Sequence, residues 1–151
     1  MIRVQEQDFD VGAEIAALRS GRTDIGAIAA FIGTVRDQAA SGRITAMTLE
    51  HYPGMTEKEL ARIEAEARER WPLQDSLIVH RIGRVTPGDN IVLVVTLSEH
   101  RQAAFESAQF LMDYLKTAAP FWKTEETAGG GHWVSARDSD EASAGRWKVK
   151  T

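Results

Sequence analysis

Residues 91–125, IVLVVTLSEHRQAAFESAQFLMDYLKTAAPFWKTE, contain the succession of elements that decides the fold class. The run at 91–97 is almost entirely apolar and rich in β-branched side chains, which is typical of a central strand covered on both faces. The spacing of apolar residues then predicts a long amphipathic helix from about residue 100 to 118, with Ser98 as its N-cap. Pro120 ends this helix, and a further strand is expected after it.

Outward from this stretch, the sequence alternates between short strands and two further helices. Strands are expected at residues 2–5, 26–32, 44–52, 77–82, 121–127 and 132–136, and helices at residues 10–19 and 56–71. Thr56 and Glu59 form a Thr-x-x-Glu capping box at the start of the second of these helices. The small polar residues 37–42 predict a mobile loop, and the glycines at 129–131 predict the loop of a hairpin. Because several strands follow one another directly, they are expected to pair antiparallel, in an α+β fold.

The length of 151 residues is enough for one domain with its own hydrophobic core. We expect a single domain at residues 1–136, followed by a polar C-terminal tail at 137–151. The net charge of −4 argues against nucleic-acid binding by the chain as a whole. No apolar run reaches the roughly 18 residues that cross a membrane. The N-terminal residues turn acidic at once, so we expect no signal peptide and a cytoplasmic location.

Cysteine is absent from the sequence, and this excludes several kinds of chemistry. A disulfide scaffold, a thiolate metal site, an iron–sulfur cluster and a cysteine nucleophile all require it. The four histidines contain no pair at the helical i, i+4 spacing, so no metal site is expected.

The strongest functional signal is a set of basic side chains at the ends of neighbouring elements. They are Arg36, His100, Arg101, Lys116 and Lys123. The start of a helix favours anions, and a guanidinium group binds phosphate through two hydrogen bonds. A lysine among other cations can acquire a lowered pKa, which suits acid–base or nucleophilic work. The pattern therefore predicts an anion site with catalytic potential.

Each of these charges also has an ordinary structural explanation. Lys116 is a favourable partner for the helix dipole at a helix C-terminus. Arg101 can be a solvated residue of a first helical turn, and Arg36 a loop charge. For Glu125, a simple ion pair with Lys123 on the surface is a sufficient explanation. Spacing alone thus indicates an anion site and leaves open whether the chain is an enzyme.

Six short motifs follow one another along the chain. They are FIGTVR (31–36), LEHYPGM (49–55), HRIG (80–83), SEHR (98–101), MDYLKT (112–117) and PFWKTE (120–125). In this order they closely resemble the large, catalytic subunit family of molybdopterin synthase, from about residue 4 to residue 147.

The resemblance implies a sulfurtransferase that converts cyclic pyranopterin monophosphate to molybdopterin. A small, ubiquitin-like partner would supply sulfur as a thiocarboxylate at its C-terminal Gly-Gly. The chain would form a homodimer within a heterotetramer, without a cofactor. The implied fold is an α+β hammerhead type with a mixed or antiparallel sheet, about three helices and an added antiparallel β subdomain.

The resemblance also implies roles for individual residues. Lys116 and Lys123 match the two catalytic lysines of the family and also contact substrate. The further substrate-binding residues would be Thr34, Val35, Arg36, His100, Arg101, Thr124, Glu125 and Arg137. Thr34 occupies a position where some relatives have lysine. The partner's tail is expected in a groove that leads to Lys116, with apolar walls from Met112, Phe121 and Trp122.

Two other functions compete with the sulfurtransferase. One is a non-catalytic module that docks the tail of a ubiquitin-like protein. The other is a phosphoryl-transfer or phosphoesterase activity in the same cationic pocket, and the lack of a metal-ligand pattern argues against it.

Overall fold

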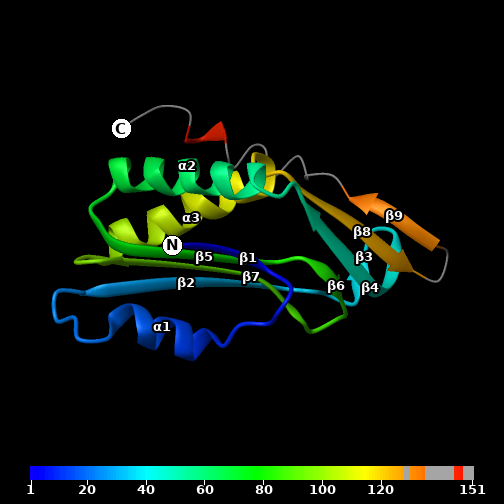
Figure 1. Ribbon diagram of the computed structural model, residues 1–151, viewed down its shortest axis with the longest axis horizontal. Coiled ribbons are helices and arrows are strands. Elements are labelled where there is room, and N and C mark those ends of the chain that lie inside the picture. The colour runs from blue at the N-terminus through cyan, green and yellow to red at the C-terminus, as the bar shows by residue number, and fades with distance from the viewer. Residues whose placement is uncertain (128–129, 135–144, 148–151) are drawn as a thin grey trace.

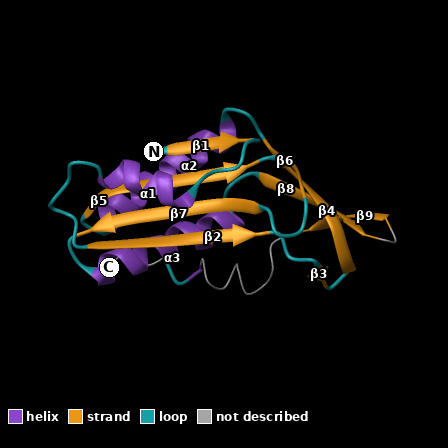
Figure 2. Cartoon of the chain, turned by 90° about the horizontal axis from the view of Figure 1, so that it is seen from below, coloured by secondary structure: helices purple, strands orange, loops and turns teal. Residues whose placement is uncertain are grey.

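The computed structural model describes residues 1–127, 130–134 and 145–147. One layer is a four-stranded sheet in the order β1-β5-β7-β2 (Figure 2). The strands are β1 (Ile2–Gln5), β5 (Leu73–Arg81), β7 (Asn90–Ser98) and β2 (Ala27–Thr34). β1 runs parallel to β5, whereas the other two pairings are antiparallel.

A second, antiparallel sheet extends from one end of the first (Figure 1). Its order is β3-β4-β8-β9. In addition, β6 pairs with residues 47–49 of β4, beyond the residues that pair with β3. The strands are β3 (Gln38–Ala39), β4 (Gly42–His51), β6 (Gly83–Val85), β8 (Phe121–Thr127) and β9 (Gly130–Val134). The α+β class and the added antiparallel subdomain are therefore confirmed.

Three helices cover the four-stranded sheet on both faces in the described part of the chain. They are α1 (Val11–Arg19), α2 (Met55–Arg70) and α3 (Arg101–Thr117). Helices α2 and α3 lie on one face and α1 lies on the other (Figure 1). Val92 and Val94 of β7 pack in the core under α2 and α3, while Leu93 and Val95 pack in the core with residues of α1. Burial on both faces explains why the predicted central strand is almost entirely apolar.

The start of α2 differs from the predicted Thr56–Glu59 capping box. The N-cap is Gly54, whose amide N–H donates to the carboxylate of Glu57 at 3.4 Å. Thr56 is fully buried in the first turn, and its hydroxyl donates to the Pro120 carbonyl oxygen at 2.9 Å. The prediction was wrong because this threonine ties the helix to the turn before β8.

The start of α3 also differs from the prediction. His100 is the N-cap, whereas Ser98 is buried at the end of β7. The Ser98 hydroxyl donates to the Pro72 carbonyl oxygen at 3.0 Å, so a contact distant in sequence replaces the predicted cap.

Two predicted loops contain strands. In the segment predicted to be a mobile loop, Gln38 and Ala39 pair with Arg43 and Gly42 in a β3–β4 hairpin. Gly130 and Gly131 belong to β9 and pair with the end of β8, instead of forming a loop. Antiparallel pairing with a neighbouring strand determines the conformation of both segments, and this pairing cannot be predicted from residue composition.

Part of the predicted C-terminal tail lies outside the described residues, and the boundary at 136 stays a prediction. The described residue Trp147 packs edge-on against Trp71 and Phe110, with ring centroids 5.5 and 5.7 Å apart. Its indole N–H donates to Asp113 at 2.6 Å. In the described ranges, no helix is both long and apolar enough to span a bilayer.

Candidate active site

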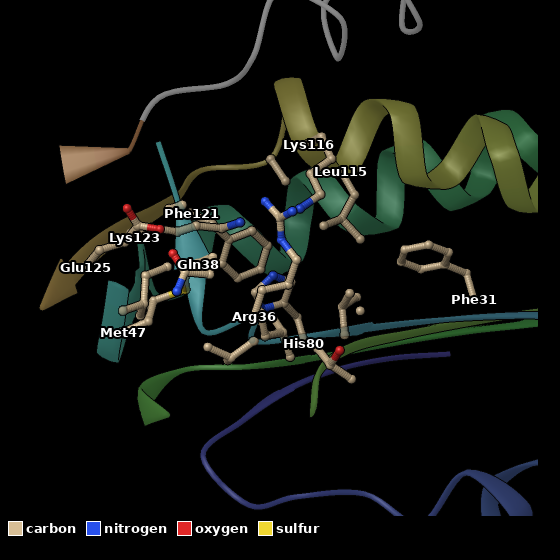
Figure 3. Close-up of a pocket in the computed structure, with 18 residues that line it drawn as sticks. Phe31, Arg36, Gln38, Met47, His80, Leu115, Lys116, Phe121, Lys123 and Glu125 are labelled. Atoms are coloured by element: carbon tan, nitrogen blue, oxygen red, sulfur yellow. The ribbon is translucent and has the colours of Figure 1, made fainter. Parts of the chain in front are cut away.

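A cavity of about 350 Å³ lies where the two sheets meet the C-terminal end of α3 (Figure 3). Its walls come from the ends of β2 and α3, from β3, β4, β5 and β7, and from β8. Six predicted site residues line it, namely Thr34, Val35, Arg36, Lys116, Lys123 and Glu125. Segments far apart in the sequence thus bring most of the expected residues to one place.

A local irregularity at the end of β2 directs Arg36 to this cavity. The pairing of β2 with β7 shifts register between Gly33 and Thr34. A Cβ at Gly33 would lie 2.8 Å from Val92 Cγ1, so a larger residue here would require the Val92 side chain to move. Beyond the shift, the Val35 N–H donates to the Asp89 carbonyl oxygen at 2.9 Å. This bond fixes the backbone immediately before Arg36.

The two lysines reach the cavity from either side of a tight connection. Lys116 lies in the last turn of α3, and Lys123 is the third residue of β8. Along β8, side chains alternate between the two faces of the sheet. Lys123 and Glu125 therefore share the cavity side, while the side chain of Thr124 projects to the other face and does not line the cavity.

Glu125 brings a carboxylate to the cationic cavity. Its side chain is 7% exposed, and the Ser41 hydroxyl donates to its Oε1 atom at 3.2 Å. Ser41 lies in the turn of the β3–β4 hairpin. The segment that was predicted to be a mobile loop from its composition therefore positions a predicted site residue, Glu125, through this hydrogen bond.

The sequence reasoning did not select His80, which also lines the cavity. The imidazole is 3% exposed and stacks on the ring of Phe121, with centroids 3.7 Å apart. Burial is the main cause that lowers the pKa of His80 from 6.5 to about 3; the hydrogen bond to the Arg81 carbonyl opposes this shift, and the charges of Lys123 and Lys116 contribute to it. The HRIG motif contained this residue, but only the fold brings it beside the two lysines.

His100 and Arg101 do not line the cavity in the single chain. They lie at the N-terminal end of α3, whereas Lys116 lies at its C-terminal end. At about 1.5 Å of rise per residue, roughly 22 Å of helix separates Arg101 from Lys116. Arg137, the remaining predicted substrate contact, lies outside the described residues.

The apolar walls differ from those predicted for the tail groove. Phe121 does line the cavity, together with Phe31 and Leu115. Met112 is packed in the core, and Trp122 lies on the outer side of β8 with 40% of its surface exposed. The helical and strand periodicities, rather than closeness in sequence to the lysines, decide which apolar side chains reach the cavity.

The arrangement combines three cations, a carboxylate, a buried imidazole and apolar walls in a concave space. Such a space can bind an anionic ligand with an apolar ring and can transfer protons from lysine. Within the described ranges, no group of three or more metal-ligating side chains is close enough together to hold a metal ion.

A family model and the curated relatives of this chain point to the same family. The family model described as MoaE protein matches residues 4–118. The molybdopterin synthase catalytic subunit of Mesorhizobium japonicum is 58% identical over 149 residues, which are 97% of this chain and 92% of that protein.

Solved structures support the same relationship. The molybdopterin biosynthesis MoaE protein from Burkholderia ambifaria has a TM-score of 0.84 at 56% identity, with 99% of this chain and 98% of that chain covered. The molybdopterin synthase from Staphylococcus aureus has a TM-score of 0.80 at 29% identity, with 88% and 96% covered. The resemblance carried by the six sequence motifs is therefore confirmed, and the chain belongs to the MoaE family of molybdopterin synthase catalytic subunits.

Proposed function

We propose that this chain converts cyclic pyranopterin monophosphate to molybdopterin, using sulfur from the thiocarboxylate of a small ubiquitin-like partner. The observation that carries the proposal is the convergence of Arg36, Lys116 and Lys123 on one cavity. The cavity volume of about 350 Å³ lies within the range of small-molecule sites. Membership of the catalytic-subunit family supports the same reaction.

The side chains suit the steps of this reaction. Arg36 can bind the substrate phosphate through charge-assisted hydrogen bonds. When the thiocarboxylate attacks the pterin side chain, negative charge develops on oxygen and protons must move. Lys116 and Lys123 can stabilise that charge and carry those protons. The chain needs no cysteine, because the partner supplies the sulfur.

The predicted roles of His100 and Arg101 require a second copy of the chain. β2 is an edge strand, and its residues Phe31 and Ile32 are 42% and 38% exposed. Its first residue, Ala27, pairs with Ser98, so His100 and Arg101 follow close to that end of the strand. The cavity lies at the other end, near Thr34.

Pairing of β2 with its own copy about a twofold axis would join opposite ends of the two strands. The eight residues of β2 span roughly 25 Å, which is close to the length of α3 between Arg101 and Lys116. Each cavity could then receive His100 and Arg101 from the other copy. This geometry supports the homodimer expected within the heterotetramer.

The partner's C-terminal tail would approach Lys116 along Phe121 and Leu115. Terminal glycines suit a narrow entry because they lack a Cβ. A cytoplasmic location of the assembly stays a prediction, which fractionation of cells would check.

The test combines the purified chain with cyclic pyranopterin monophosphate and a partner ending in a thiocarboxylate, followed by mass spectrometry of the pterin. We expect the dithiolene product and a partner returned to its carboxylate form. Docking of the partner without pterin turnover would favour the non-catalytic module. Release of phosphate without sulfur incorporation would favour a phosphoesterase instead.

A further inference from the structure

We propose that His80 contacts the substrate in the cavity, where its unprotonated Nε2 accepts a hydrogen bond from an N–H group of the pterin ring. The inference rests on the proposed function, because it names the part of that substrate which His80 meets.

The sheet holds His80 in place at the cavity wall. The residue lies near the end of β5, where its backbone pairs with Val4 of β1 and Val92 of β7. Strands on both sides therefore restrain its backbone. Figure 3 shows the side chain extending from the sheet toward the cavity, on the side opposite the helix end that carries Lys116.

A single hydrogen bond fixes which ring nitrogen carries the proton. Nδ1 of His80 lies 2.7 Å from the carbonyl oxygen of Arg81. A carbonyl oxygen can only accept, so Nδ1 must be the protonated nitrogen. In the neutral ring, Nε2 then has a lone pair and acts as an acceptor.

The surroundings keep this ring neutral and oriented. Phe121 stacks on it with an interplanar angle of 14°. Burial is the main cause that holds the pKa at about 3, and the charges of Lys123, Lys116 and His51 act in the same direction. At neutral pH, His80 therefore adds no positive charge to the cavity.

An unprotonated nitrogen repels phosphate oxygens and attracts N–H donors. The cavity thus has two kinds of polar wall, with Arg36 and the lysines suited to phosphate and His80 suited to the heterocycle. This difference would fix the orientation of the substrate and bring its side chain toward the lysines. Backbone N–H groups of the partner's terminal glycines offer the same chemistry, so the experiment must separate the two donors.

The experiment measures substrate binding by calorimetry in the complex with a partner that ends in an ordinary carboxylate, which prevents turnover. His80→Phe keeps an aromatic ring beside Phe121 but removes the acceptor, and should weaken substrate binding about tenfold. His80→Gln can present an amide oxygen near the Nε2 position and should stay within about threefold of wild type. His51→Phe is the matched control, because His51 is near His80 but does not line the cavity.

Equal substrate affinity of the wild type and His80→Phe would overturn the role of His80 alone. Loss of affinity only for the partner would also overturn it, since the donor would then be the tail. Absence of substrate binding by the wild-type complex would overturn the proposed function as well.

Nitrogen NMR of the wild-type complex provides a second measurement that does not depend on a variant folding. We expect His80 to have a protonated Nδ1 and an unprotonated Nε2 at pH 7, with the Nε2 resonance shifting when substrate is added. A protonated Nε2, or a resonance that substrate leaves unchanged, would contradict the proposal.

Discussion

β7 and β8 flank the same helix, yet their residues serve different purposes. Eight of the nine residues of β7 are buried, in keeping with its place between two helical layers. In β8 only Glu125 is buried, and one side of the strand faces the cavity. The comparison teaches that the residues of β7 are chosen for packing in the core, whereas those of β8 include polar groups that face the cavity. Substitutions in the two strands should therefore separate stability from activity.

The largest effect is expected at the lysines of the cavity. Lys116→Ala and Lys123→Ala should each reduce turnover at least a hundredfold, the range typical of lost acid–base catalysis. Neither side chain belongs to the hydrophobic core, so the melting temperature should change little. Rates of product formation and thermal unfolding check both statements, and near-normal turnover in either variant would remove that lysine from the mechanism.

The converse change is Leu93→Ala in β7. Leu93 is fully buried, and its truncation should lower the free energy of unfolding by about 2–5 kcal/mol. The side chain packs in the core on the α1 face of the sheet, away from the cavity. Urea unfolding measures the loss, while turnover per folded molecule should remain close to wild type. A large drop in that specific turnover would break the separation of the two regions.

Arg36→Ala should have a smaller effect on the cavity side. A hydrogen bond to a charged group is worth about 1.5–3 kcal/mol, so substrate affinity should fall roughly tenfold or more. Raised salt should weaken the wild-type affinity as well. Calorimetry measures the substrate affinity of Arg36→Ala. An unchanged affinity would mean that the phosphate binds elsewhere.

The pH dependence of stability should show the cavity's influence on His80. Its pKa is about 3 in the folded chain and near 6.5 when unfolded, so the unfolded state binds more protons between these values. Its contribution to stability is therefore complete above pH 6.5 and falls as the pH drops toward 3, by at most about 1.4 kcal/mol per pH unit. Unfolding of wild type and His80→Gln across this window should give a shallower slope for the variant; equal slopes would argue against the lowered pKa.

The same contrast explains what could be predicted from the sequence. The central strand and α3 were recognisable, because burial on two faces and helical amphipathicity leave periodic patterns. The roles of Thr56 and Ser98 were not, since their hydroxyls bond to carbonyl groups that are distant in sequence. Local capping patterns do not contain that information.

The candidate site divides in a similar way. The motifs selected Arg36, Lys116 and Lys123, and the fold brings all three to one cavity. His80 was missed because its place in the cavity depends on neighbours from other elements. His100 lies at the opposite end of α3 from Lys116, so in a single chain it does not reach the cavity.

The most direct test of the account is turnover by the double variant Lys116→Ala/Lys123→Ala beside the two single variants. If both lysines act on one substrate in one cavity, their effects should not add, and the double variant should be within a few-fold of the slower single variant. Its melting temperature should remain near that of the wild type. A double variant whose loss equals the product of the two single losses would contradict joint action, and a collapse in melting temperature would show that the lysines maintain the fold instead.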